Sequence, residues 1–66
     1  MLTPRQREVA ELVGQMLSTK AVARELGISV RTVEVHISAA ASRLPGEGAP
    51  REKLVAFFSP RGPETF

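Results

Sequence analysis

The sequence predicts an all-α fold in which three helices form a core and a short C-terminal helix follows them. Helix-start signals recur along the chain, apolar residues repeat at helical spacing, and no segment shows the alternation of a β-strand. The 66 residues suffice for one small domain. We expect this domain to span residues 1–58 and the C-terminal residues 59–66 to form a disordered tail.

The first helix is predicted to begin at Pro4, because proline suits the first helical position and Thr3 can cap the helix. Gln6 stands at the spacing of a capping box, in which two side chains bond to each other's backbone amides. Gly14 is expected to weaken the end of this helix. Apolar residues at i, i+3, i+4 and i+7 spacing predict one buried face, formed by Val9, Leu12, Val13 and Met16.

Residues 18–44 predict two helices joined by a tight turn, the second with a polar outer face. The earlier helix is expected to end at about Leu26, because Gly27 is free to adopt the left-handed conformation that reverses the chain. This arrangement is typical of a helix-turn-helix, which places its second helix in the major groove of DNA. Small or apolar residues are expected to let the two helices meet over a shared core: Val22, Ala23, Leu26, Ile28 and Val33.

Both helices of this segment have start signals. Ser18 or Thr19 can cap the earlier helix, and Ser29 can cap the later one through the amide of Arg31 or Thr32. The later helix is predicted to have an inner face of Val33, Ile37, Ala40 and Leu44. Its outer face is predicted to consist of Arg31, Glu34, Val35, Ser38 and Ser42.

A fourth helix is predicted over about Pro50 to Phe58. Pro45 and Gly46 are expected to stop the third helix and open a loop, after which Pro50 suits a first helical position. Pro60 is expected to end this last helix. Apolar residues cover much of its circumference: Leu54, Val55, Phe57 and Phe58.

The net charge is +2, and the surplus lies in the segment 18–44. That segment carries Lys20, Arg24, Arg31 and Arg43 against Glu25 and Glu34, whereas the charges before and after it balance. A basic excess on the helix-turn-helix favours a polyanionic partner such as nucleic acid.

Other function classes find little support. The chain has no cysteine, one histidine and no aspartate, so we expect no metal site, no cofactor and no enzymatic activity. His36 is interpreted as a packed histidine rather than a ligand. No apolar run approaches the ~20 residues of a membrane span, and no small-molecule ligand is evident, so we expect a soluble intracellular protein.

Three motifs in this order resemble the LuxR-type (GerE-like) helix-turn-helix DNA-binding domain. LTPRQREV resembles the opening of its first helix, LSTKAVARELGIS its scaffold helix and turn, and SVRTVEVHIS followed by Arg43 and Leu44 its recognition helix. The resemblance covers about residues 2–58. It implies a four-helix domain of a bacterial transcription regulator, cytoplasmic and associated with the nucleoid. Its recognition helix, about residues 29–44, would enter the major groove of double-stranded DNA.

The resemblance also implies roles for individual residues. Base contacts are expected from Glu34, Val35 and Ser38, where a valine suits a thymine methyl group and a carboxylate suits cytosine N4. A solvated Glu34 paired with Arg31 is the alternative. Phosphate contacts are expected from Lys20, Ser29, Arg31, Thr32 and Arg43. A homodimer through the last helix would involve Leu54, Val55, Phe57 and Phe58.

The chain departs from the family pattern in two places. The loop before the last helix is about two residues longer than is usual in the family, and Ala40 and Ala41 stand where large apolar residues are common. We hypothesise that Phe57 and Phe58 fill the space left by these alanines.

Two other functions remain open at this point. One is a module like region four of sigma factors, which would also dock on RNA polymerase. The other is a protein-interaction adaptor that has the fold without DNA binding. A chain of 66 residues leaves no room for a sensing domain, so we expect a free-standing regulator or an output domain of a longer one.

Overall fold

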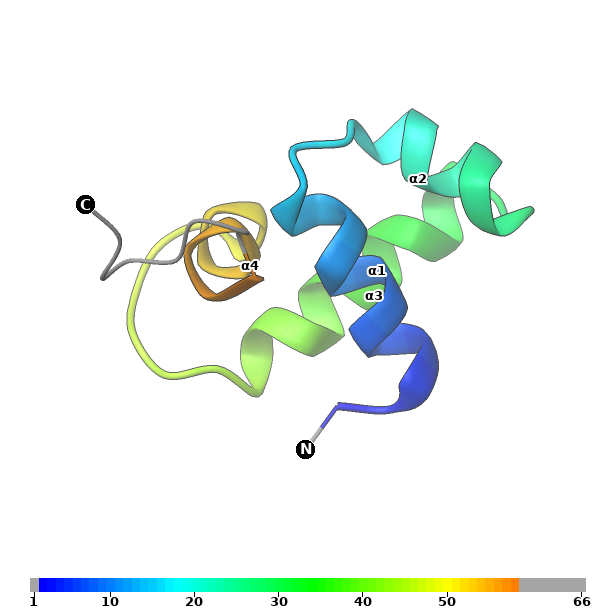
Figure 1. Ribbon diagram of the computed structural model, residues 1–66. Coiled ribbons are helices and arrows are strands. Elements are labelled where there is room, and N and C mark those ends of the chain that lie inside the picture. The colour runs from blue at the N-terminus through cyan, green and yellow to red at the C-terminus, as the bar shows by residue number, and fades with distance from the viewer. Residues whose placement is uncertain (1, 59–66) are drawn as a thin grey trace.

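The computed structural model describes residues 2–58, which form four helices and no strand (Figure 1). The helices are α1 (Pro4–Gly14), α2 (Thr19–Leu26), α3 (Val30–Ser42) and α4 (Pro50–Phe58). The predicted all-α fold of four helices is therefore confirmed. The predicted disorder of the tail, residues 59–66, lies outside the described residues.

The helices are arranged around α1 and α3, which pack against each other. α4 packs on both of them, whereas α2 packs mainly on α3. Figure 1 shows α2 and α4 on opposite sides of α1, and within the described residues these two helices make no contact. α3 is thus packed against all three other helices, whereas α2 is held by α3 and α1 alone within the described residues.

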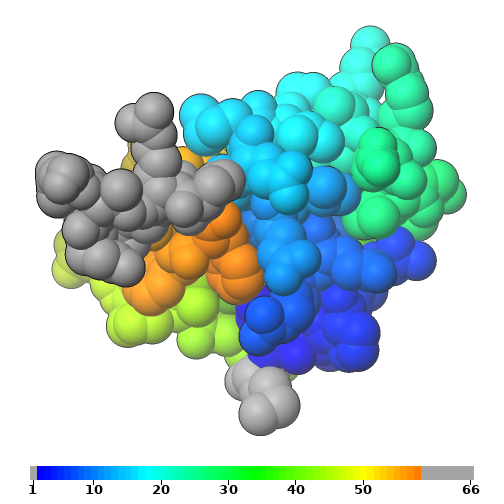
Figure 2. Space-filling view, viewed as in Figure 1, coloured from blue at the N-terminus to red at the C-terminus, as the bar shows by residue number. Residues whose placement is uncertain are grey.

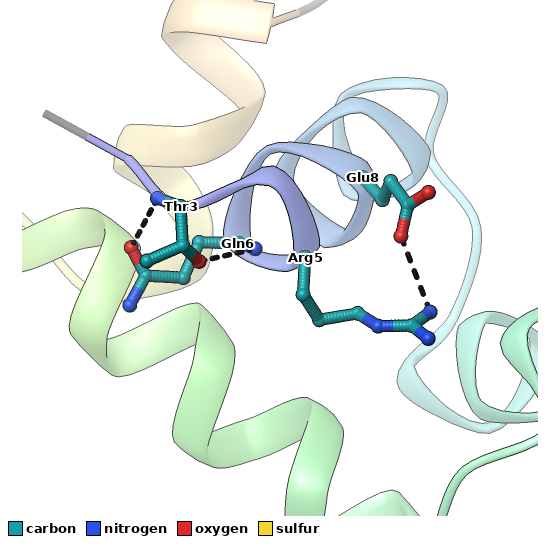
Figure 3. A network of polar contacts seen from close by, with 4 residues as sticks. All are labelled: Thr3, Arg5, Gln6 and Glu8. Carbon is teal, nitrogen blue, oxygen red and sulfur yellow. Dashed lines mark hydrogen bonds and ion pairs between the residues drawn. The ribbon is translucent and has the colours of Figure 1, made fainter.

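α1 begins as the sequence predicts. The Thr3 hydroxyl accepts a hydrogen bond from the Gln6 amide at 3.1 Å, and the Gln6 side-chain oxygen accepts one from the Thr3 amide at 3.1 Å (Figure 3). The next turn carries an exposed ion pair between Arg5 and Glu8 at 3.2 Å. This capping box satisfies amides that the first turn of a helix leaves without partners.

All four helices contribute to a single core. Its members are Val9, Ala10 and Val13 from α1, Val22 and Ala23 from α2, Val33, Ile37 and Ala40 from α3, and Leu54 from α4. Leu26 and Ile28, on either side of the turn, are partly buried against it. The small residues among these let the short helices approach closely, as the sequence predicts for Ala23.

The end of α1 corrects one prediction. Met16 was expected in the buried stripe, but the helix ends at Gly14, and Met16 is 69% exposed with a φ of 71°. The Met16 amide bonds to the Val13 carbonyl at 2.8 Å and the Leu17 amide to the Leu12 carbonyl at 3.3 Å. This is the Schellman pattern, which reverses the chain before residue 16 can reach the core.

The end of α3 also differs in detail, because the helix ends at Ser42 rather than near Leu44. The amides of Arg43 and Leu44 bond to the carbonyls of Ala40 and Ala41 at 3.1 and 3.0 Å, a tighter spacing than that of an α-helix. Gly46 and Gly48 follow with φ angles of 97° and 122°. The loop 43–49 thereby turns the chain back so that α4 covers α1 and α3.

The hypothesis that Phe57 fills the space beside the alanines of α3 is wrong. Phe57 is 51% exposed, whereas Leu54 is completely buried and is the member of the core that α4 supplies. Phe58 is partly buried against the core. Residues 57 and 58 lie on either side of Leu54 around the helix, and α4 docks with the side of Val55 and Phe58 toward the core, so Phe57 faces away from it.

Gly14 of α1 lies in very close contact with Phe58 of α4. A Cβ atom at Gly14 would lie 2.7 Å from Cβ of Phe58 and closer still to the Phe58 carbonyl group. Figure 2 shows α4, in orange, lying directly against the end of α1 and the turn that follows it. Glycine at residue 14 is therefore required by packing, in addition to its effect on the helix end.

Candidate nucleic-acid interface

The turn between α2 and α3 is formed by Gly27, with a φ of 68° and a ψ of 36°. The Ile28 amide bonds to the Ala23 carbonyl at 3.0 Å, which closes the end of α2. Apart from Gly27 and its chain neighbours, no atom of residues 2–58 lies within 4 Å of the position that a Cβ would take at Gly27, so the left-handed backbone alone favours glycine here. The predicted left-handed turn is confirmed.

Both helices of the motif start at a serine. The Ser18 hydroxyl accepts from the Ala21 amide at 3.0 Å, which decides between the two cap candidates for α2. The Ser29 hydroxyl accepts from the Thr32 amide at 3.0 Å and lies 2.9 Å from the Thr32 hydroxyl. Only one of these two hydroxyls donates to the other, so one O–H at the start of α3 is available to an acceptor outside the protein.

α3 has the two faces that the sequence predicts. Val33 and Ala40 are completely buried and Ile37 is 6% exposed, because α1, α2 and α4 pack against this side. Leu44, beyond the end of the helix, is partly buried against the core. The opposite face is open to solvent at all of its predicted positions, namely Arg31, Glu34, Val35, Ser38 and Ser42. We call these five residues the outer face of α3.

Val30 is an exposed residue of α3 that the sequence interpretation did not include. It is the first residue of the helix, is 40% exposed, and lies one helical turn before Glu34. The signal was present in the sequence, because the first residues of a recognition helix are the ones that reach base edges. It adds a second exposed apolar group near the outer face, which already contains Val35, 55% exposed.

The predicted phosphate-contacting residues lie at the helix ends. Lys20 and Arg31 are exposed at the second residue of α2 and of α3, and Thr32 is half-buried beside its partner Ser29. Arg43 is exposed directly after α3. A helix start also presents free backbone amides and a partial positive charge, both of which suit anions. Basic groups thus stand near both ends of α3.

The charges on the outer face are not paired with each other. Within residues 2–58, no ion pair joins Glu34 to Arg31, which was the structural alternative for Glu34. The ion pairs of Arg5 with Glu8 and of Arg7 with Glu11, at 3.2 and 3.8 Å, both lie on α1. The carboxylate of Glu34 is therefore exposed to solvent without a cation from α3 beside it.

The predicted dimer residues of α4 differ in their exposure. Leu54 is fully enclosed by the core of its own chain, so it is not available to a second copy and is removed from this set. Val55 and Phe58 are partly buried, and Phe57 has the largest exposed fraction of the four. A contact with another molecule at α4 would therefore centre on Phe57.

Among residues 2–58, no group of three or more His, Cys, Asp or Glu side chains stands close enough to hold a metal ion, and His36 is half-buried on α3. None of the four helices in the described part of the chain has the length and the apolar character that crossing a membrane requires.

The arrangement of α2, Gly27 and α3 defines the class of protein, a helix-turn-helix domain. The family model described as "Bacterial regulatory proteins, luxR family" matches residues 1–47. The chain belongs to this family, and its fold is the helix-turn-helix DNA-binding domain of LuxR-type regulators. The resemblance stated from the sequence motifs is thereby confirmed.

Curated relatives agree with this assignment. Over 48 residues, or 73% of this chain, the protein is 50% identical to the spore germination protein GerE of Bacillus subtilis. It is 36% identical over 64 residues to the tetrathionate response regulatory protein TtrR of Salmonella typhimurium. The transcriptional regulatory protein UhpA of Escherichia coli is 51% identical over 35 residues, or 53% of this chain.

The chain is shorter than each of these relatives. It spans 65% of the length of GerE, 31% of TtrR and 18% of UhpA. No solved structure matches the chain. The names of the three relatives are those of regulatory or germination proteins rather than of enzymes.

Proposed function

We propose that this chain binds double-stranded DNA in a sequence-specific manner and regulates transcription, with α3 inserted into the major groove. The observation that carries the proposal is the open outer face of α3, whose opposite side is buried against the other helices. A helix whose outer face is free can enter a groove about 12 Å wide without disturbing its own core. The family membership and the name of UhpA, a transcriptional regulatory protein, support the same function.

Sequence readout is assigned to Glu34, Val35 and Ser38, all exposed on α3. The Val35 methyl groups suit the methyl group of thymine, the Glu34 carboxylate can accept from cytosine N4, and the Ser38 hydroxyl can bond to a base or a phosphate. Glu34 has no cation from α3 beside it, so a donor on a base is a suitable partner for its carboxylate.

Affinity and register are assigned to the groups at the helix ends: Lys20, Ser29, Arg31, Thr32 and Arg43. The hydroxyl pair of Ser29 and Thr32 can donate one hydrogen bond to a phosphate without giving up the cap of α3. Lys20 and Arg31 add positive charge near the two helix starts. Such contacts hold the protein on the duplex without reading its sequence.

We further propose that two copies pair through α4 around the exposed Phe57 and bind a palindromic site. Two-fold related helix-turn-helix domains place their recognition helices about 10 bp apart, one turn of the duplex. RNA polymerase is a second candidate partner of such a regulator. Binding to the chromosome would place the protein in the bacterial cytoplasm, at the nucleoid.

The test is selection of bound sites from a random DNA pool, followed by a salt titration on the selected duplex. We expect a motif with two-fold symmetry and a slope of log affinity against log salt of about −2.7, because three of the assigned groups, Lys20, Arg31 and Arg43, are cations. Selection of a promoter-like element only together with RNA polymerase would instead favour the module like region four of sigma factors. Absence of saturable binding to any duplex would overturn the proposal in favour of a protein-interaction adaptor.

A further inference from the structure

A hydrogen bond from α4 reaches the turn in front of α2. The Nη2 atom of Arg51, the second residue of α4, donates to the carbonyl oxygen of Leu17, 34 residues earlier in the chain. Leu17 directly precedes Ser18, whose hydroxyl caps α2. The bond therefore joins the start of α4 to the start of the first helix of the helix-turn-helix.

Apart from this hydrogen bond, α4 has no direct contact with α2 within the described residues. Instead, α2 is held mainly by α3. The α1–α2 turn contains Met16 in a left-handed conformation, and its direction decides where α2 begins. Since Arg51 holds the Leu17 carbonyl of this turn, it is placed to influence the position of α2.

The environment of Arg51 marks it as more than a surface charge. Its Nη1 atom is buried and has no hydrogen-bond partner among residues 2–58. A positive charge in the first turn of a helix is also unfavourable for the helix dipole. The contact of Arg51 with Leu17 therefore persists despite two unfavourable terms, the buried Nη1 atom and the charge at the helix start. A residue that served only solubility would have its charged group in solvent.

We propose that Arg51 is a positioning residue for DNA binding, because it fixes the start of α2 and with it Lys20. Lys20 lies two residues after the Ser18 cap, and the proposed function assigns it a phosphate contact. Arg51 itself touches no DNA in this proposal, which rests on the proposed function. Its loss would free the turn, and Lys20 would no longer stand in register with its phosphate.

A double-mutant cycle on the full chain tests this. Arg51→Met is expected to make the salt slope of DNA binding shallower by about 1, as Lys20→Ala does, although Lys20 is still present. Lys20→Ala should then add nothing in the Arg51→Met background. Arg51→Lys, which keeps a donor and a charge, should restore the slope. The matched control is Lys53→Met, which removes a charge from the same helix without removing the bond to Leu17.

Amide hydrogen exchange of the free protein gives a second readout that does not depend on DNA. Arg51→Met, or Arg51→Gln if the Met variant does not fold, should speed exchange of the Ala21 amide, which the Ser18 cap protects. The Thr32 amide, protected by the equivalent cap at Ser29, should be unchanged. Equal acceleration at both amides would mean general loosening and would overturn the proposal.

The outcomes separate this inference from the proposed function. If Lys20→Ala changes the slope equally in both backgrounds, or Lys53→Met acts like Arg51→Met, the inference fails while DNA binding stands. If Lys20→Ala leaves the wild-type slope unchanged, the phosphate contact assigned to Lys20 is wrong, and the role of Arg51 in DNA binding falls with it.

Discussion

Met16 and Gly27 hold equivalent positions after α1 and α2, with φ angles of 71° and 68°. In both turns the amide of the next residue, Leu17 or Ile28, donates a hydrogen bond to the carbonyl oxygen five residues earlier, with N···O distances of 3.3 and 3.0 Å. Glycine adopts this left-handed conformation without steric penalty, whereas a residue with a Cβ atom pays about 1–2 kcal/mol. The same turn is thus built once from a favourable residue and once from an unfavourable one.

We predict that Met16→Gly stabilises the domain by about 0.5–1 kcal/mol. Relief of the left-handed strain outweighs the greater flexibility of glycine in the unfolded chain, and little apolar burial is lost because Met16 is 69% exposed. Urea unfolding followed by circular dichroism measures the change. Gly27→Ala serves as the control and should destabilise by about 1 kcal/mol. A destabilised Met16→Gly variant would show that the Met16 side chain makes contacts that outweigh the strain.

Gly14→Ala is predicted to destabilise the domain by about 1–3 kcal/mol. Alanine normally favours a helix over glycine by about 1 kcal/mol, but here its Cβ would lie 2.7 Å from Cβ of Phe58 and against the Phe58 backbone. Backbone cannot move aside as a flexible side chain can, so α4 must shift. Thermal unfolding measures the effect, and a stabilised variant would mean that α1 and α4 are not in close contact.

The two apolar residues Leu54 and Phe57 of α4 should respond very differently to truncation. Leu54→Ala is predicted to cost about 2–5 kcal/mol, because it leaves a cavity in the core where Leu54 is 0% exposed. A domain of this size has only about 3–10 kcal/mol of stability, so the variant should lose a large part of it. Phe57→Ala, at a residue 51% exposed, should cost much less. Similar unfolding midpoints for both variants would contradict the observed orientation of α4.

Phe57→Ala also tests pairing through α4. If two copies meet at this exposed ring, the variant should remain folded and lose affinity for a palindromic site while keeping its affinity for a single half-site. Gel-shift titrations with the two duplexes measure the difference. If the ratio of the affinity for the palindromic site to that for the half-site is the same in wild type and variant, Phe57 makes no dimer contact.

Lys20→Ala is predicted to weaken binding to all duplexes alike and to make the salt slope shallower by about 1. A phosphate contact depends on charge and position but not on base sequence, so specific and random DNA should be affected equally. Arg7→Ala is the control, because it removes one positive charge from α1, where Arg7 pairs with Glu11. A slope that changes equally in both variants would indicate a net-charge effect in place of a local contact.

Val35→Ala is predicted to alter the preference at a single base pair and to leave nonspecific affinity nearly intact. The side chain is 55% exposed, so its truncation should change the stability of the domain little. Loss of a contact with a thymine methyl group should change the base preference only at the base pair that carries this thymine. Site selection with wild type and variant measures the preference. An unchanged motif combined with a lower unfolding midpoint would assign Val35 a structural role.

Local sequence signals determined where the helices begin and what faces they have. Thr3 with Gln6 fixes the start of α1. Ser18 and Ser29 fix the starts of the next two helices, because each hydroxyl accepts a hydrogen bond from the backbone amide three residues later. The buried and exposed faces of α3 likewise follow from helical periodicity alone. Such signals are readable because each involves residues within one or two turns of one another.

The tertiary structure alone decided what depends on distant parts of the chain. Gly14 is closely packed against Phe58, and Leu54 rather than Phe57 lies in the core because of how α4 docks. The bond of Arg51 to Leu17 joins residues 34 positions apart. No local pattern encodes such contacts, since they exist only once the helices have packed and have filled the space between them.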